Sequence, residues 1–227
     1  MKEYNSIKKF CDDETLHGEQ VVAFNKLDGQ NFRVKYNTKG ANKHQFTLFG
    51  SRTQLVDETT ENFGEAVKFF KANYEDVLRK IIIENSGKKS IFHNVEEITL
   101  FFEWYGDNSF AGFHQQGDKM HLALIDVFIK KKGYIEPNTF IEVFYGKGVE
   151  VPEVIFKGKL DMNFVNSIVN NDWTNDDCQH PRVKEGVVIK RTTLLKGQRL
   201  PMCKVKTRWW LDKLHNSFSE EMWELLE

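Results

Sequence analysis

A lysine followed closely by an acid and a glycine is the strongest local signal in the chain. Lys26, Asp28 and Gly29 come after an apolar stretch, and Asn31 and Arg33 follow on what reads as one strand face. A lysine that is desolvated or placed beside other cations loses its proton more easily, and its neutral amine is a nucleophile. The alternative is a β-hairpin with an Asp-Gly turn and a surface Lys–Asp pair. Residues 26–33 alone do not distinguish between these two interpretations.

A second group of cations lies near the end of the chain. Lys204 and Lys206 alternate around Val205, which predicts that both face one side of a strand. Two cations there could hold a phosphate group and lower the pKa of Lys26. The alternative is an edge strand that is protected by lysines. The surrounding segment, residues 182–208, has nine basic residues and one acid, which could be a wall for anions or plain variation of the surface.

Other charged residues flank apolar runs. Glu103 follows the apolar residues 100–102, and Glu185 and Lys190 enclose a run of four apolar or glycine residues. An offset of five places two side chains on opposite faces of a regular strand. Glu185 must therefore precede the strand if both residues face one ligand. Arg52 could orient phosphates. The alternatives are a strand-end ion pair for Glu103 and a solvated surface position for Arg52.

The elements that must position these residues are mostly strands. The candidate segments are rich in β-branched and aromatic residues, and they span residues 21–24, 31–36, 46–49, 99–104, 122–128, 187–191 and 202–206. Apolar residues at three- and four-residue steps predict one amphipathic helix over 63–83, capped by Thr60 or Asn62. Shorter helices are predicted over 161–170, 208–214 and 219–226. The pattern predicts an α+β fold dominated by antiparallel strands.

Composition excludes several classes of protein. The 227 residues include 32 Lys and Arg against 33 Asp and Glu, with 40% hydrophobic residues, which is typical of a globular domain and not of a uniformly basic nucleic-acid-coating protein. The widely spaced Cys11, Cys178 and Cys203 indicate reduced thiols in a cytosolic setting. The first residues lack the apolar core of a signal peptide, and no apolar run approaches the ~20 residues of a membrane span.

Five short blocks of the sequence occur in the same order as the motifs of a known protein superfamily. They are Lys26-x-Asp28-Gly29-x-Asn31, Phe102-Glu103, Asp126-Val127, the stretch from Glu185 to Lys190, and Lys204-Val205-Lys206. Together they resemble the covalent nucleotidyltransferase superfamily, which contains ATP-dependent DNA and RNA ligases and mRNA capping enzymes.

Within this superfamily, two segments are most similar to the bacteriophage T4 RNA ligase 2 type. One is Gly29-Gln30-Asn31-Phe32 and the other contains Arg52-Thr53. The chain departs from that type at Asp28, where His is usual, and at Ile125, where an aromatic residue stacks on adenine.

The resemblance implies an ATP-grasp-like nucleotidyltransferase domain of antiparallel sheets flanked by helices, with the nucleotide bound between the sheets. This domain would span residues 1–207, followed by a short helical tail over 208–227 and no OB-fold domain. Lys26 would be the catalytic nucleophile that carries AMP. The implied nucleotide-binding residues are Asp28, Asn31, Arg33, Arg52, Glu103, Ile125, Glu185, Lys190, Lys204 and Lys206. A Mg²⁺ or Mn²⁺ ion would be held, largely through water, by Asp28, Glu103 and Glu185.

The implied function is that of an ATP-dependent RNA ligase that joins 5′-phosphate and 3′-hydroxyl RNA ends. It would act through a lysyl-AMP intermediate and an adenylylated 5′ end. The expected partners are nicked or single-stranded RNA ends, with a DNA-containing duplex as a further candidate, and a partner protein could supply additional substrate binding. The compact form suggests a phage or virus and action in the host cytoplasm. The alternatives are a DNA ligase or capping-type enzyme with the same lysine chemistry, or a non-catalytic RNA- or nucleotide-binding relic.

Overall fold

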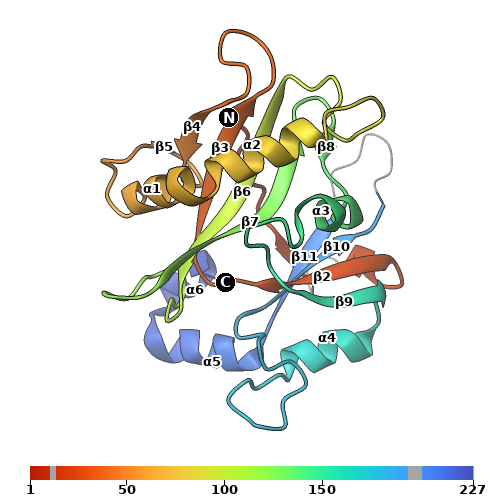
Figure 1. The fold of residues 1–227 in the computed structure, drawn as a ribbon. Helices are drawn as coiled ribbons and strands as arrows, with labels where there is room; N and C mark the ends of the chain where they lie inside the picture. The colour runs from red at the N-terminus through yellow and green to blue at the C-terminus, as the bar shows by residue number, and fades with distance from the viewer. Residues whose placement is uncertain (11–13, 194–200, 227) are drawn as a thin grey trace. The chain divides into compact units, whose positions relative to one another are not determined.

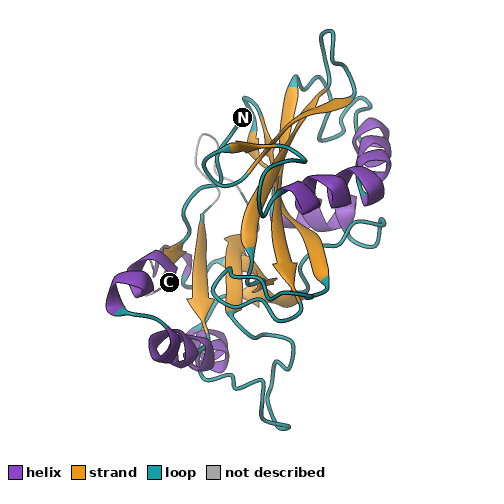
Figure 2. Ribbon diagram, turned by 90° about the vertical axis from the view of Figure 1, so that its left-hand side faces the viewer, coloured by secondary structure: helices purple, strands orange, loops and turns teal. Residues whose placement is uncertain are grey.

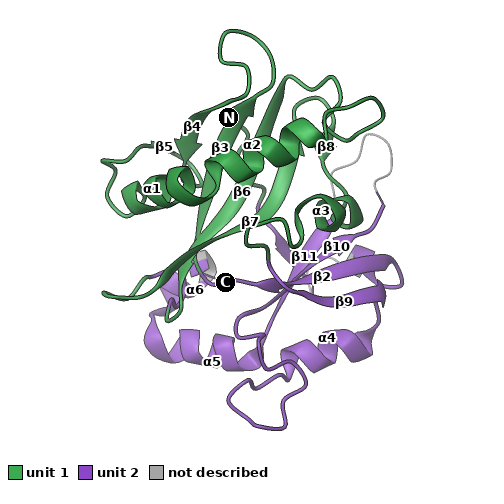
Figure 3. Ribbon diagram, in the orientation of Figure 1, with its two compact units in different colours: residues 1–5, 29–108, 114–151 green, residues 6–28, 109–113, 152–227 purple. Residues whose placement is uncertain are grey.

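The structure, a computed structural model, describes residues 1–10, 14–193 and 201–226 (Figure 1). Cys11 lies outside this part of the chain, as do Lys196 and Arg199, two of the nine basic residues within 182–208. The chain divides into two compact units, each assembled from separate segments (Figure 3). Unit 1 consists of Met1–Asn5, Gly29–Asn108 and His114–Val151, and unit 2 consists of Ser6–Asp28, Ser109–Phe113 and Pro152–Glu227.

Unit 1 contains a six-stranded antiparallel sheet. Its strands are β3 (Gln30–Asn37), β4 (Gln45–Gly50), β5 (Leu55–Val56), β6 (Glu97–Gly106), β7 (Met120–Ile129) and β8 (Gly133–Tyr134), in the order β5-β4-β3-β6-β7-β8. Its helices are α1 (Gly64–Asn73), α2 (Glu75–Glu84) and α3 (Pro137–Phe144).

Alternation along β3 gives the sheet of unit 1 two different faces. Phe32, Val34 and Tyr36 are fully buried. The ring of Phe70 in α1 packs edge-on against Phe102, the partner of Phe32 in β6. Asn31 and the other alternate residues of β3 therefore project from the opposite face. One face builds the core with the helices, and the other presents polar side chains.

The prediction of one helix over residues 63–83 is wrong, because the helix is interrupted at Tyr74. This residue ends α1 and precedes α2, with φ −119° and ψ −21°. Its ring stacks on Phe102, and its hydroxyl accepts a hydrogen bond from the backbone N–H of Glu150. The predicted side-chain cap is also absent, because the N-cap of α1 is Phe63, which makes no side-chain cap hydrogen bond.

Unit 2 contains a five-stranded sheet with three α-helices (Figure 2). Its strands are β1 (Lys8–Lys9), β2 (Gln20–Lys26), β9 (Val154–Lys159), β10 (Gly186–Arg191) and β11 (Met202–Lys206), in the order β1-β11-β10-β2-β9. Only the β1–β11 pair, among the described strands of this sheet, is parallel. The helices are a 3₁₀ turn η2 (Glu14–Leu16), α4 (Met162–Val169), α5 (Arg208–Ser217) and α6 (Glu220–Leu226).

One face of the unit 2 sheet packs on α4. The apolar cluster on that face joins Val21, Ala23, Val187, Ile189, Cys203 and Val205 to Phe164, Val165 and Ile168 of the helix. α4 is capped by Asp161, whose side chain accepts a hydrogen bond from the Phe164 N–H at 2.9 Å. Burial of alternate residues leaves the intervening side chains of β2, β10 and β11 on the other face.

The α+β fold of antiparallel strands and flanking helices is confirmed, and each of the seven predicted strands is present. The hairpin interpretation of Asp28-Gly29 is wrong, because β2 and β3 belong to different sheets. Strands β1, β5, β8 and β9 and helix α3 were not predicted. Within the described part of the chain, no helix combines the length and apolar character that crossing a membrane requires.

Candidate active site

Lys26 is the last residue of β2, and its side chain meets a carboxylate. Its Nζ lies 2.9 Å from Oε2 of Glu185. Glu185 is the residue directly before β10, and Gly186 is the register partner of both Lys26 and Lys206. The requirement that Glu185 precede its strand is therefore met. The end of one strand and the start of its neighbour bring these side chains together.

Glu185 joins two lysines. Its second oxygen, Oε1, lies 3.1 Å from Nζ of Lys206, and the two side chains are only 3% and 5% exposed. Burial lowers the pKa of Lys206 from 10.5 to about 8, aided by repulsion from Lys26 and Lys204 and opposed by the attraction of Glu185. Two lysines thus share one buried carboxylate, with Lys204 close enough to repel Lys206, and the cluster carries an excess of positive charge. Such a cluster suits a phosphate group.

A glycine lets the three strands approach at this point. Gly186 has φ +151°, and a Cβ atom there would overlap the backbone carbonyl of Val205 in β11. A side chain at position 186 would therefore separate β10 from β11 and move Glu185 away from Lys206. Gly186 is therefore required for the close packing of β10 on β11, as well as being part of the sequence motif.

The register confirms that Lys204 and Lys206 lie on one face of β11. Lys204 pairs with Val188, and Lys206 pairs with Gly186. Lys190 also projects from this face, because it pairs with Val22, four residues before Lys26 in β2. Lys190 is 4% exposed, and its Nζ lies 5.3 Å from the centre of the Phe24 ring. Lys190 therefore shares the face of the cluster but stands further along the sheet.

The carboxylate of Asp28 accepts three hydrogen bonds from unit 2 itself. The backbone N–H groups of Ala111 and Gly112 donate at 2.8 and 2.7 Å, and the indole Nε1 of Trp210 donates at 2.8 Å. Asp28 lies two residues after Lys26, so these bonds fix the chain directly after the lysine. A contact of Asp28 with nucleotide or metal stays a prediction.

In unit 1, the polar face of the sheet gathers three predicted residues. Asn31 pairs with Glu103, and Arg33 pairs with Phe101, so the side chains of Asn31, Arg33 and Glu103 project from the same face. The Asn31 amide donates to the Phe102 carbonyl at 3.3 Å, whereas its buried Oδ1 has no hydrogen-bond partner. An unsatisfied buried acceptor favours a ligand that brings a donor.

Arg33 is held by the protein. Its Nε donates to the carbonyl of Ser51 at 2.7 Å, and its Nη1 donates to the carbonyl of Lys2 at 3.0 Å. Only 3% of Arg33 is exposed, and burial lowers the pKa of the guanidinium. These contacts tie the first residues of the chain to the sheet. A role for Arg33 at the nucleotide stays a prediction.

The remaining predicted residues occupy irregular positions in unit 1. Ile125 is the extra residue of a bulge in β7, because Phe101 pairs with Asp126 and Phe102 pairs with Leu124. A bulge redirects the side chain that it carries. Arg52 lies in the exposed turn between β4 and β5.

A metal cage is not formed by the side chains that the structure describes. In that part of the chain, no group of three or more His, Cys, Asp or Glu residues is arranged to hold a metal ion. The prediction that Asp28, Glu103 and Glu185 hold a divalent ion through water remains a prediction.

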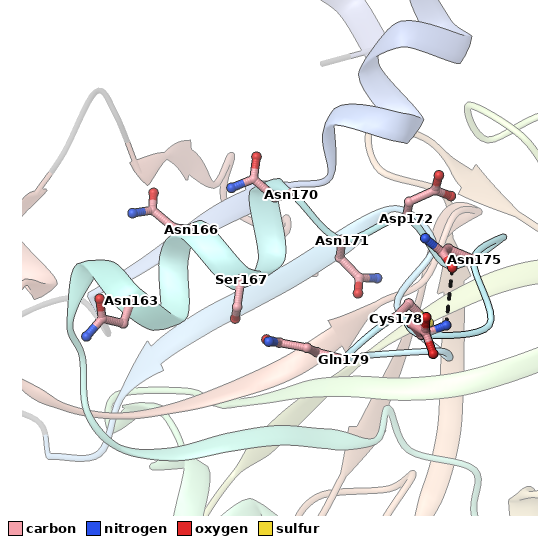
Figure 4. A pocket seen from close by; sticks show the side chains of 10 residues that line it. Asn163, Asn166, Ser167, Asn170, Asn171, Asp172, Asn175, Cys178 and Gln179 are labelled. Atoms are coloured by element: carbon pink, nitrogen blue, oxygen red, sulfur yellow. Dashed lines mark hydrogen bonds between the residues drawn. The ribbon is translucent and has the colours of Figure 1, made fainter.

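A polar pocket of about 560 Å³ lies elsewhere in unit 2, beside α4 and the loop that follows it (Figure 4). Its lining is rich in amides, including Asn163, Asn166 and Asn170. Asn171 anchors the loop, because its Nδ2 donates to the carbonyls of His180 and Val183, both at 3.0 Å. None of the predicted site residues lines this pocket.

Two residues of the site were not predicted. The indole of Trp210 contacts Asp28, and its ring centre lies 3.5 Å from Nζ of Lys206. Thr207 caps α5 by accepting a hydrogen bond from the Trp210 N–H, and its hydroxyl donates to the carbonyl of Lys184. A threonine directly before a predicted helix is a cap signal that sequence can supply.

Comparison with solved structures supports the fold. A ligand-free variant of Naegleria gruberi RNA ligase is 18% identical with a TM-score of 0.61, and the match covers 94% of this chain and 58% of that one. The same enzyme with PPi is 17% identical with a TM-score of 0.59, covering 96% and 59%. A variant with AMP and Mn is 16% identical with a TM-score of 0.57, covering 94% and 58%.

This chain therefore spans less than two thirds of the length of these solved chains. No curated protein matches the sequence. The model of the RNA ligase family matches residues 19–206, a stretch that contains every predicted site residue from Lys26 to Lys206. The chain belongs to the RNA ligase family.

Proposed function

We propose that this protein is an ATP-dependent RNA ligase whose first step is transfer of AMP from ATP to Lys26. The observation that carries the proposal is the Lys26–Glu185–Lys206 cluster, in which a candidate nucleophile stands beside a buried carboxylate and a second lysine. Membership of the RNA ligase family supports the choice of reaction.

The proposed step balances as a phosphoryl substitution. Nζ of Lys26, after losing one proton, attacks the α-phosphorus of ATP. An N–P bond forms, the bond from the α-phosphorus to the bridging oxygen breaks, and pyrophosphate leaves. Charge on the phosphate oxygens needs stabilisation during this transfer. Lys206 and Lys204, which lie on the same face of β11, are the groups that we assign to it.

Glu185 organises the two lysines in this proposal. A carboxylate that contacts both ammonium groups sets their separation before ATP binds. When the α-phosphate arrives, its oxygens supply a second anionic partner for Lys206. The buried acceptor Asn31 Oδ1, on the polar face of the unit 1 sheet, is a candidate partner for a donor of the nucleotide.

We propose that a divalent ion accompanies the phosphates of ATP. Mg²⁺ and related ions keep several waters and bind substrate phosphates together with one or two carboxylates, so a protein cage of three side chains is not required. Structures of the Naegleria enzyme contain ATP or AMP together with Mn. Asp28, Glu103 and Glu185 are the carboxylates that we assign to the outer shell of the ion.

The later steps would pass AMP to an RNA 5′-phosphate and then join that end to a 3′-hydroxyl with release of AMP. RNA repair at nicked or single-stranded ends is the corresponding biological role. Family membership supports RNA as the substrate. A DNA-containing duplex, a partner protein, a phage or viral source and a cytoplasmic location remain predictions.

Two RNA substrates test the proposal. The first carries a 5′-phosphate and is supplied with ATP and Mg²⁺, and the second carries a preformed adenylylated 5′ end without ATP. Wild-type protein should join both, whereas Lys26→Ala should fail on the first and still join the second. Lys157→Ala, which changes an exposed lysine of the same sheet, is the matched control and should join both. Failure of wild type on both substrates, tested as nicks and as single strands, would contradict the proposal.

A further inference from the structure

A buried tryptophan of unit 2 contacts two of the residues that surround Lys26. Trp210 is 1% exposed and is the largest fully buried side chain of the described chain. Its indole N–H donates to Oδ2 of Asp28 at 2.8 Å, and its ring lies under the ammonium of Lys206. A residue needed only for helix packing has no reason to meet both of these charged groups.

The contact with Asp28 completes an anion-binding arrangement. Ala111 and Gly112 have φ of +52° and +77°, which turns two successive N–H groups toward one carboxylate. With the indole of Trp210, three donors meet Asp28 from two separate segments. Because Asp28 stands two residues after Lys26, the tryptophan helps to fix the direction in which the chain leaves the nucleophile.

The contact with Lys206 restricts the position of that side chain. Nζ of Lys206 lies 3.5 Å from the centre of the Trp210 ring, within the range of a strong cation–π interaction. The same Nζ contacts Oε1 of Glu185 at 3.1 Å and donates to the backbone carbonyl of Leu226 at 2.9 Å. The ring therefore forms one wall of the space in which the ammonium can move.

The helix that carries Trp210 is anchored beside Glu185. The N–H of Thr207 donates to the carbonyl of Glu185 at 2.9 Å, and its hydroxyl donates to the carbonyl of Lys184 at 2.7 Å. The Trp210 N–H in turn donates to the Thr207 hydroxyl oxygen at 3.1 Å. The first turn of α5 is thus tied to the backbone that leads into β10, and the tryptophan is placed relative to all three charged residues.

We propose that Trp210 is a positioning residue for AMP transfer, holding Lys206 with its ring and Asp28 with its indole N–H so that both keep one arrangement around Lys26. The inference rests on the proposed function, because it assigns a role within that reaction. It predicts an effect on the rate of transfer at saturating ATP. A tryptophan that served only to stabilise the fold would change the melting temperature and leave the rate per folded molecule unchanged.

The test compares three substitutions by the rate at which label from α-labelled ATP becomes attached to the protein, over a range of ATP concentrations. Trp210→Phe keeps a ring under Lys206 but removes the N–H, and should lower the maximal rate about tenfold, the effect of losing a hydrogen bond to a charged group. Trp210→Leu also removes the ring and should lower it about 100-fold. Trp209→Phe is the control, because it changes a neighbouring tryptophan whose ring packs on Trp173 and lies under the ammonium of Lys213.

Melting curves of each variant give the folded fraction by which the rates are divided. Asp28→Asn provides a second variant with unchanged volume at the other end of the same hydrogen bond. The double variant Asp28→Asn, Trp210→Phe should lose much less of the rate than the product of the two single-variant fold-losses.

Rates per folded molecule equal to wild type in Trp210→Phe and Trp210→Leu, or independent effects in the double variant, would overturn the inference. Absence of label on wild-type protein would instead refute the proposed function, so the two failures are distinguishable.

Discussion

The charge on Lys206 should make the folded protein less stable at neutral pH than at about pH 10.5. Burial lowers its pKa from 10.5 to about 8, even though Glu185 attracts its charge. The ammonium is therefore harder to keep charged in the folded state than in the unfolded chain. At about 1.4 kcal/mol for each pH unit, the difference of about 2.5 units between 10.5 and 8 corresponds to roughly 3 kcal/mol. Lys206→Met removes the charge and keeps most of the volume.

The sign of the pH dependence follows from proton binding. Between about pH 8 and 10.5 the unfolded chain holds a proton on Lys206 that the folded protein has released. Stability of the wild type must therefore rise with pH through this interval. The variant lacks this contribution. The free energy of unfolding of Lys206→Met, relative to that of the wild type, should therefore fall by roughly 3 kcal/mol between pH 7 and about pH 10.5.

Urea unfolding at several pH values between about 7 and 10.5 measures this difference directly. Groups that do not interact with Lys206 titrate equally in both proteins and cancel in the comparison. Lys157→Met, at an exposed position of β9, is the control and should run parallel to the wild type. A difference between wild type and Lys206→Met that stays constant across the interval, or that grows with pH, would refute the reasoning. The same variant should transfer AMP at least about 100-fold more slowly if Lys206 stabilises the phosphate.

Three further substitutions test other parts of the structure. Gly186→Ala should destabilise the protein by about 3 kcal/mol or more, because the new Cβ overlaps the Val205 carbonyl, and it should abolish AMP transfer; a melt close to that of wild type would contradict this. Tyr4→Phe removes the hydroxyl that donates to the buried Asp126 at 3.1 Å and should cost about 1–3 kcal/mol in a urea titration. Asn171→Ala removes three hydrogen bonds to the backbone of the following loop and should lower the urea midpoint and speed limited proteolysis within residues 172–183; unchanged cleavage would show that the loop is held by other contacts.

The strands and the orientation of their side chains could be predicted from the sequence, because the alternation of residue types that indicates them is local. Alternation within 31–36 identified the polar face of β3, and alternation around Val205 placed Lys204 and Lys206 on one face of β11. The position of Glu185 followed from an offset of five residues. In each of these cases the period of a strand decides the orientation of neighbouring side chains.

The helix break and the separation of β2 from β3 could not be predicted in the same way. The periodicity continues across Tyr74, where α1 ends and where the ring packs on Phe102 and the hydroxyl contacts Glu150. Both partners are distant in sequence. Asp28-Gly29 has the composition of a hairpin turn, yet the chain passes there from one sheet to another. Such choices depend on tertiary packing, which outweighs local preference.

The hydrogen-bond partners of the charged residues also could not be predicted from the sequence. Arg33 holds the carbonyls of Lys2 and Ser51, and Asp28 holds two backbone N–H groups and the indole of Trp210. A motif indicates that a charged residue is needed at a position, but it does not show which protein groups satisfy it. The role of Trp210 is visible only when α5 is folded against the residues around Lys26.

The central claim is that Lys26 becomes covalently linked to AMP, and labelling tests it most directly. Purified protein is incubated with Mg²⁺ and ATP labelled at the α-phosphate, denatured, and examined for retained label, with Lys26→Ala beside it. We predict an acid-labile label on the wild type that is absent from the variant. Label that persists on Lys26→Ala, or no label on wild-type protein that has first been stripped of AMP with pyrophosphate, would contradict the assignment of Lys26 as the nucleophile.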